Sequence, residues 1–160
     1  MRKWKYTACL AAAMGLACIG AVAADARFVV SADGQEVLDT RTSLVWRRCV
    51  EGMTWDGSTC KGKAAKYKFG QAKQKAEVAA PEQGKPWRVP MKDELATLVI
   101  QQKKKPMTDK EAFPNTPASL LWAKRPGFDD NLNGWMIHFG SGKVFGGIGT
   151  KGFVRLVRDN

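Results

Sequence analysis

The chain has 160 residues, with 26 Lys and Arg against 15 Asp and Glu, and it therefore carries a formal net charge of +11. This length suits one compact domain and excludes a large two-domain enzyme. An apolar content of 44%, which includes 6 Trp and 7 Phe, supplies a hydrophobic core and excludes a largely disordered chain.

Residues 1–23 have the form of a secretory signal peptide. Three basic residues among the first five precede an uncharged apolar run, residues 6–22, which is rich in Ala and Gly. Small residues then match the cleavage pattern, so we expect cleavage after residue 23, or as late as residue 26. A retained membrane anchor is the alternative, although the run is short and only weakly hydrophobic. We expect an exported bacterial protein, periplasmic or secreted, with its domain in residues 27–160 and no stable membrane span after cleavage.

The basic charge belongs to the exported domain. Removal of residues 1–23 leaves 23 basic and 15 acidic residues, a net charge of +8. A positive field of this size favours polyanionic partners such as sulfated glycans, nucleic acid or acidic lipids. Positive charge without a dedicated partner is the alternative.

Two cysteines, Cys49 and Cys60, remain after the signal peptide. An even pair in an oxidising compartment predicts a disulfide, which would stabilise the domain by roughly 2–3 kcal/mol. Zinc is disfavoured because two thiols and a single His cannot supply four ligands. A redox dithiol would usually have two residues between its cysteines, and here there are ten.

The N-terminal part of the domain predicts short strands separated by turns. Apolar and β-branched residues alternate there with Asp, Gly and Thr. The expected strands are residues 27–32, 36–39 and 43–46. The loop between the two cysteines follows, with a turn at residues 55–58.

Two helices are expected in the middle of the chain. Residues 61–80 carry Phe and Ala at helical spacing among Lys and Gln, which predicts an amphipathic helix that ends before Pro81. A shorter helix begins near Lys92 and would bury Leu95 and Leu98. Pro90 forces the preceding residue into an extended conformation.

The C-terminal half returns to strands. The expected strands are residues 119–122, 134–139, 143–147 and 152–158, with polar loops at 101–110 and 128–133. Gly140-Ser141-Gly142 predicts a hairpin loop. Short antiparallel strands with two helices indicate a single compact α+β domain.

The residues argue against catalysis. His138 is the only histidine, and no second His or free thiol supports a Ser-His-Asp or Cys-His set. We therefore expect a strand-surface histidine and no enzymatic activity. A hydrolase that uses Asp129, Asp130 or His138 is the remote alternative.

The segment from residue 129 to residue 134 invites a test for calcium. Asp129, Asn131 and Asn133 match the first, third and fifth positions of an EF-hand loop, but Gly140 stands where the bidentate Glu should be. We expect a turn rich in Asp and Asn and no cofactor, with calcium at these three residues as the alternative.

Two features could bind a ligand. The densest run of charge is Lys103-Lys104-Lys105, with Lys124 and Arg125 further on. These side chains predict loosely specific contact with phosphate or sulfate groups, although a solvated loop would look the same. Trp55 could stack on a sugar ring.

Several segments, taken in order, resemble one bacterial family. They include a Val-Leu-Asp to Thr-Ser-Leu-Val-Trp stretch, a Trp-Arg-Val-Pro segment followed by Glu-Leu, a Leu-Trp-Ala segment and a Gly-Phe-Val-Arg-Leu-Val-Arg ending. The set resembles the Lcl C-terminal domain family, found on exported bacterial proteins and on collagen-like adhesins, over nearly all of residues 28–159. The motif residues are Trp46, Trp87, Arg88, Pro90, Glu94, Leu95, Trp122, Arg155 and Arg158.

The resemblance implies an α+β fold related to C-type lectin-like domains, with the motif residues as architecture. It also implies an adhesin-like, non-catalytic domain that contacts a polyanionic glycan or an envelope partner through basic loops. We expect no nucleic-acid partner. In the adhesins the domain follows a trimerising stalk, and this chain has no Gly-X-Y repeat to form one. The alternative is a structural accessory of an envelope assembly, such as a pilus or secretion system, that recognises protein.

Overall fold

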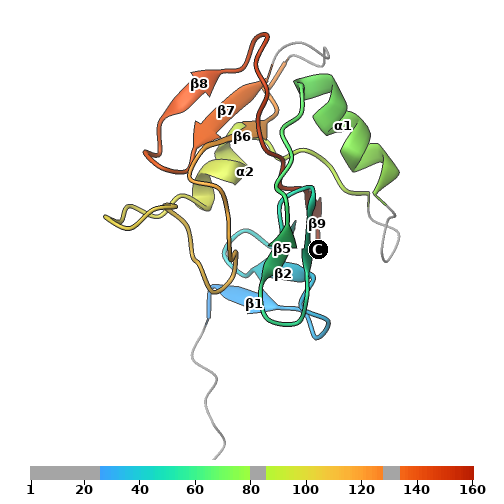
Figure 1. The fold of residues 1–160 in the computed structure, drawn as a ribbon, viewed down its shortest axis with the longest axis vertical. Helices are drawn as coiled ribbons and strands as arrows, with labels where there is room; N and C mark the ends of the chain where they lie inside the picture. Colours follow the sequence, from blue (N-terminus) through green and yellow to red (C-terminus); the bar gives the residue numbers. More distant parts are fainter. Residues whose placement is uncertain (1–25, 80–85, 128–133) are drawn as a thin grey trace, which may run out of the picture.

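The computed structural model describes residues 26–79, 86–127 and 134–160 (Figure 1). The expected signal peptide and the expected calcium loop lie outside the described residues. Within them, nine short strands and two helices form the α+β domain that the sequence predicts. The elements are β1 (Phe28–Val30), β2 (Glu36–Asp39), β3 (Leu44–Arg47), β4 (Met53–Trp55), β5 (Cys60–Gly62), α1 (Phe69–Val78), α2 (Lys92–Thr97), β6 (Leu120–Ala123), β7 (Trp135–His138), β8 (Val144–Gly146) and β9 (Val157–Asp159).

The first three strands and the last one form a single antiparallel sheet in the order β1-β2-β3-β9. Its register sets Val37 opposite Trp46, and Trp46 opposite Val157. Paired residues point to the same side of a sheet, so these three fully buried side chains form one apolar face. The predicted strands at 36–39 and 43–46 agree with β2 and β3 to within one residue.

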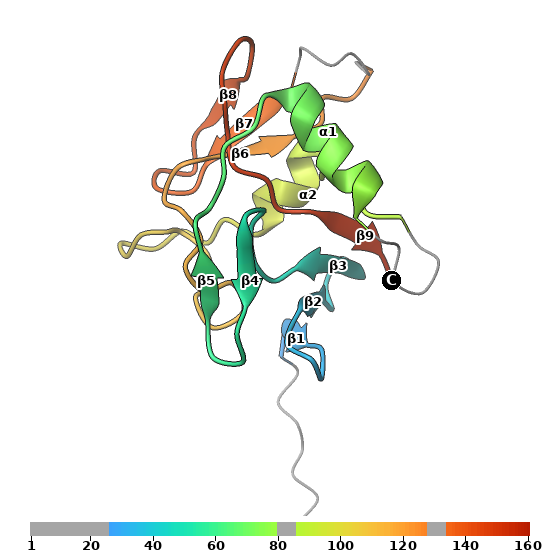
Figure 2. The same cartoon turned by 45° about the vertical axis from the view of Figure 1, so that its right-hand side comes forward.

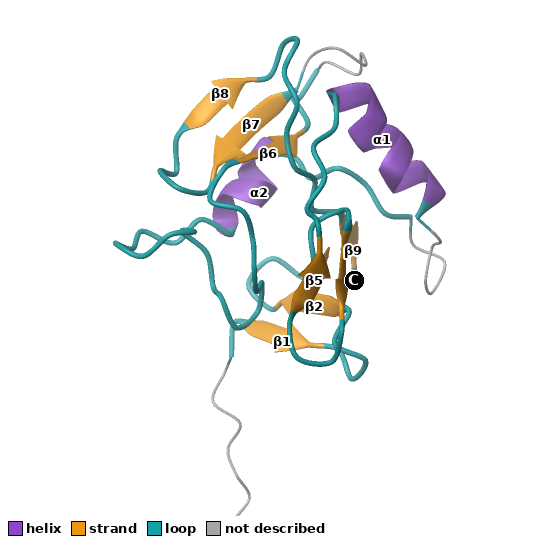
Figure 3. Ribbon diagram, viewed as in Figure 1, coloured by secondary structure: helices purple, strands orange, loops and turns teal. Residues whose placement is uncertain are grey.

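A second antiparallel sheet contains β6, β7 and β8, with β7 in the middle. Leu121 and Ile137 are paired and buried, and α2 packs against β7 (Figure 3). The predicted hairpin loop at residues 140–142 is confirmed, because the Gly142 N–H donates to the His138 carbonyl at 2.7 Å. β8 lies at an edge of this sheet.

An extended C-terminal segment connects the two sheets (Figure 2). The prediction of one strand over 152–158 was wrong in part, because only β9 forms a ladder, with β3. Further upstream, the Phe153 N–H donates to the Leu120 carbonyl and the Phe153 carbonyl accepts from the Trp122 N–H, both at 2.9 Å. Two short pairings with different neighbours therefore replace one continuous strand.

Helix α1 is half the length that the periodicity predicts, since it spans Phe69–Val78. The preceding residues belong to β5 and to an extended segment in which Tyr67 and Gly152 exchange both backbone hydrogen bonds, at 2.8 and 3.0 Å. Gly62, with φ of 104°, also has a backbone that breaks a helix. Tertiary pairing therefore overrides helical spacing before residue 69. The apolar spacing after it is confirmed, because Phe69, Ala72 and Ala76 are buried.

The loop between the cysteines is a β-hairpin, which the sequence did not predict. β4 and β5 pair so that Trp55 faces Cys60, and the turn at residues 55–58 lies between them. Cys49 and Cys60 form the predicted disulfide, with Cα atoms 5.6 Å apart. The disulfide thus ties the hairpin to the end of β3.

The core has two parts, and the three tryptophans of the motif are divided between them. Trp46 lies in the part beneath the four-stranded sheet, together with Leu95 and Leu98 of the α2 region. Trp87 and Trp122 lie in the part beneath α1. In the described part of the chain, no helix is long and apolar enough to cross a membrane.

Candidate functional site

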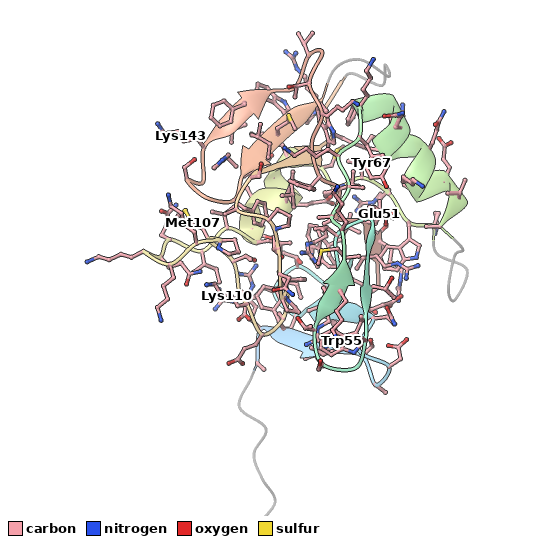
Figure 4. The ribbon with its side chains drawn as sticks, viewed as in Figure 1. Glu51, Trp55, Tyr67, Met107, Lys110 and Lys143 are labelled. Carbon is pink, nitrogen blue, oxygen red and sulfur yellow. A yellow bond between two sulfur atoms is a disulfide. The ribbon has the colours of Figure 1, made fainter. Side chains whose placement is uncertain are left out.

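The lysine run forms the exposed tip of an anchored loop, here called the lysine loop and defined as residues 100–108. Lys103, Lys104 and Lys105 are exposed, whereas Met107 is buried (Figure 4). Backbone hydrogen bonds fix the base, from the Ile100 N–H to the Met107 carbonyl at 2.9 Å and from the Met107 N–H to the Phe139 carbonyl at 2.6 Å. The loop therefore has a fixed base and a solvated cationic tip.

A side-chain amide closes the lysine loop from within. The Gln102 Nε2 group donates to the carbonyls of Pro106 and Thr108, at 3.0 and 3.1 Å. Among the described residues, none of the three tip lysines forms a salt bridge. Their charges are therefore available to an external anion.

Lys110 and Lys143 lie on the same side of the molecule as the lysine loop (Figure 4). The β7–β8 hairpin loop lies against the loop base, because a β-carbon on Gly142 would lie 3.6 Å from Gln101 Nε2 and 3.9 Å from Met107 Cε. The nearby Asp109 carboxylate is engaged locally, since it accepts the N–H groups of Glu111 and Ala112, each at 2.9 Å. Lys110 and Lys143 therefore add two exposed cations to the side of the molecule that carries the three tip lysines.

Lys124 and Arg125 do not join the lysine loop. β6 begins opposite His138, beside the loop base, and ends with Ala123 opposite Trp135. Lys124 follows at that far end, where its N–H donates to the Pro90 carbonyl at 2.7 Å. Arg125 lies over the Trp135 ring, 5.3 Å from its centroid. The structure therefore divides the predicted basic patch into two places.

A second basic surface was missed by the sequence analysis. The extended segment between β5 and α1 exposes Lys63, Lys66 and Lys68, and Lys151 is next to Gly152 on the paired segment. We call these four residues the lysine ridge. The sequence does contain a signal for this surface, because the stretch between Asp56 and Glu77 has six lysines and no acidic residue. Helical periodicity obscured it by suggesting that these side chains point in several directions.

Trp55, the proposed stacking residue, is half-buried. The Arg48 guanidinium lies 3.6 Å from its ring centroid, and Gly34 lies so close to the indole that a β-carbon there would overlap it. Arg48 is itself held by the carbonyls of Glu111 and Ala112, at 2.9 and 3.2 Å. One face of the ring is therefore occupied by protein. Stacking of a sugar on Trp55 stays a prediction.

The Trp-Arg-Val-Pro…Glu-Leu motif forms a structural junction. Arg88 pairs with both carboxylate oxygens of Glu94, at 2.7 and 2.9 Å, and also contacts Asp159 of β9 at 3.0 Å. Glu94 in turn accepts the Met91 N–H at the start of α2, at 2.7 Å. These hydrogen bonds raise the pKa of Arg88, the one to Glu94 most strongly. The motif thus connects α2 to the C-terminal strand.

The two remaining motif arginines are buried. Arg158 forms a salt bridge with Glu36 of 2.6 Å inside the four-stranded sheet. Arg155 donates to the carbonyls of Arg47 and Arg48 and, at 2.6 Å, to Thr116 Oγ1. Both arginines therefore bind buried groups of the protein itself, which is a structural role.

His138 is half-buried at the end of β7, where its Nδ1 accepts the Gly140 N–H at 3.2 Å and lies 3.2 Å from Ser141 Oγ. Both contacts lie within the hairpin loop. No carboxylate is recorded at the ring among the described residues, and no group of three metal-ligating side chains occurs there. Asp129, Asp130, Asn131 and Asn133 lie outside the described residues.

These features define a small α+β domain with one disulfide, tryptophan and arginine side chains buried in its core, and exposed lysines in its loops. The model of the Lcl C-terminal domain matches residues 35–158, and the chain belongs to that family. Searches of curated proteins and of solved structures found no match. The relation to C-type lectin-like domains therefore stays a prediction.

Proposed function

We propose that the protein is an exported, non-catalytic binding domain whose lysine loop contacts a polyanionic glycan. The observation that carries this proposal is the set of three exposed cations, at residues 103–105, on a loop whose base is fixed by backbone and Gln102 hydrogen bonds. An anchored loop loses less conformational entropy on binding than a mobile one.

The chemistry of lysine sets what such a site can recognise. Each ammonium group is a compact point charge without the bidentate geometry of arginine, so it accepts sulfate, carboxylate or phosphate with little discrimination. Exposed charges are screened by salt over about 10 Å at 0.1 M ionic strength. Binding should therefore be salt-sensitive and governed by the density of negative charge on the glycan.

Retention on heparin tests the proposal. The protein, as cells process it, is eluted with a salt gradient beside an unrelated protein of equal pI and beside two triple variants. One variant replaces Lys103, Lys104 and Lys105 with Gln, and the other replaces Lys63, Lys66 and Lys68 of the lysine ridge with Gln. Both variants lose the same charge, so a difference between them reports position and not net charge.

We expect the wild type to elute later than the pI-matched protein, and the loop variant to elute earlier than the ridge variant. Elution of the wild type together with the pI-matched protein would show that the charge is generic. Earlier elution of the ridge variant would place the anion site on the ridge.

A second candidate function is that of an accessory in an envelope assembly that recognises protein. The open edge of β8 favours it, because Val144 and Phe145 are 45% and 44% exposed and Ile148 is 76% exposed. Unpaired edge strands with apolar side chains are templates for a partner strand. Capture of a specific envelope protein that is lost in a Phe145→Lys variant, without heparin retention beyond the control, would favour this second function.

A further inference from the structure

A polar cleft of about 320 Å³ lies beside the disulfide, between the end of β3, the β4–β5 hairpin and α1. Among the described residues, its charged lining consists of one carboxylate, Glu51, and two cations, Arg47 and Lys75. Met53 and Val78 provide apolar surface in the same cleft. A volume of this size falls at the lower end of the range of small-molecule sites, about 300–1,000 Å³.

The Glu51 carboxylate forms no hydrogen bond or salt bridge with the described parts of the chain. Its backbone is fixed on both sides, since its N–H donates to Val154 at 2.9 Å and its carbonyl accepts from Ala65 at 3.0 Å. Its side chain makes no recorded hydrogen bond or salt bridge, although the residue is half-buried (Figure 4). Burial raises the pKa of Glu51, while Arg47 and Lys75 act in the opposite direction.

The two cations of the cleft are held by aromatic rings and not by carboxylates. The Arg47 guanidinium lies 4.6 Å from the Trp87 ring centroid, and Lys75 Nζ lies 5.5 Å from the Tyr67 ring centroid. Cation–π contacts position a charge without neutralising it. Both groups therefore keep their charge available to a ligand.

The presence of both positive and negative charges in the cleft limits which ligand it can bind. A simple anion would leave the Glu51 carboxylate without a counter-charge, and a simple cation would leave Arg47 and Lys75 without one, whereas a ligand that carries both charges pairs with all three groups. We infer that this cleft binds a small zwitterion in which a primary ammonium group lies a few bonds from an acidic group. The ammonium group pairs with Glu51, and the acidic group lies between Arg47 and Lys75.

Two sources offer this chemistry. An amino acid or a peptide end carries a carboxylate, and a phosphoethanolamine group carries a phosphate. L-leucine and O-phosphoethanolamine are the probes for the two sources. Isopentylamine and 4-methylpentanoate are the controls, because each keeps the leucine side chain and only one of its two charges.

Titrations followed by ¹H–¹⁵N NMR provide the test. We expect saturable shifts of amides in residues 47–54 and 75–79 with at least one zwitterion at millimolar concentration, and much weaker shifts with either control. The stronger zwitterion identifies the source. The inference is overturned if neither zwitterion gives saturable shifts, or if either half-ligand binds as well as the zwitterion.

A variant pair locates the carboxylate. Glu51→Gln keeps the shape of the side chain and should weaken binding about tenfold or more, as expected for the loss of a charged hydrogen bond. Glu77→Gln, which removes the same charge from the exposed side of α1, should leave binding unchanged. Equal affinity of the Glu51→Gln variant and the wild type would overturn the inference.

The titration of Glu51 itself gives a readout that does not depend on a variant. A bound ammonium group favours the charged carboxylate, so saturating zwitterion should lower the pKa of Glu51, measured by its ¹³C carboxyl shift. An unchanged pKa at saturation would contradict the ammonium–Glu51 pairing. Heparin retention of Glu51→Gln should equal that of Glu77→Gln, which has the same net charge, so this inference and the proposed glycan site can fail separately.

Discussion

Arg155 is a buried cation that pairs with no carboxylate in the part of the chain that the structure describes. The residue is 1% exposed, its guanidinium lies 4.6 Å from the Phe113 ring centroid, and its hydrogen-bond acceptors are backbone carbonyls and Thr116. Desolvation lowers the pKa of Arg155. The two carbonyl acceptors belong to Arg47 and Arg48, directly before Cys49. Arg155 therefore holds the C-terminal segment to the start of the disulfide loop.

We predict that Arg155→Met lowers the free energy of unfolding by about 3 kcal/mol, because it leaves buried acceptors without a donor. The relief of a desolvated charge offsets part of the loss and keeps the value below that of a broken buried ion pair. Urea denaturation measures the change. Arg41→Met, at an exposed position, is the control and should change stability by less than about 0.5 kcal/mol. Equal stabilities of the two variants would show that the guanidinium is dispensable.

At the scale of single elements, α2 lacks half of its N-terminal cap. Met91 occupies the N-cap with φ of −66° and ψ of 156°, and its side chain forms no cap hydrogen bond, whereas the Glu94 carboxylate accepts the Met91 N–H. A hydroxyl at this position could accept the N–H of residue 94 in the usual capping box. Met91 is also 38% exposed, so little apolar burial would be lost on replacement.

Met91→Ser should therefore raise the free energy of unfolding by about 0.5–1 kcal/mol. Met91→Ala is the matched control, because it removes the same thioether without adding an acceptor. The midpoints of urea denaturation of the two variants give the comparison. A serine variant no more stable than the alanine variant would show that the Arg88–Glu94 junction alone fixes the start of α2.

Local signals predicted those elements whose form depends on neighbours in sequence. Strands β2 and β3, the start of α2 and the 140–142 turn agree with the positions expected from strand alternation, from the apolar spacing after Pro90 and from glycine content. The segment before Phe69 was predicted wrongly because its Tyr67 pairs with Gly152, 85 residues away, and no local pattern reports such a partner. The β4–β5 hairpin was missed because its strands have three residues each, too few to show alternation.

At the scale of the whole molecule, the placement of charge was the least predictable feature. The sequence predicted the exposed lysines at 103–105, because consecutive charges cannot be buried. It could not separate Lys124 from them, since the separation depends on which end of β6 faces the hairpin loop. The cleft at Glu51 combines residues from β3, the hairpin and α1, and only the tertiary fold brings them together.

The stability of the domain should change differently when lysines are removed from a binding loop and when a lysine is removed from a structural ion pair. Residues 24–160 carry a net charge of +8, so the folded state is destabilised by self-repulsion. The tip lysines at 103–105 form no salt bridge among the described residues that would offset this cost. Lys61, in contrast, is paired with the Asp56 carboxylate at 2.5 Å, and the bond to Lys61 contributes most to lowering the pKa of Asp56.

We therefore predict that replacing Lys103, Lys104 and Lys105 with Gln raises the melting temperature at low ionic strength, and that the gain disappears at high salt, where the repulsion is screened. Lys61→Gln also removes a positive charge but should not raise the melting temperature, because it removes an attraction together with the repulsion. Thermal melts of both variants and the wild type across a salt series make the comparison. If the loop variant instead melts below the wild type at every salt concentration, the lysines support the fold, and a loss of heparin retention in that variant would no longer identify a binding site.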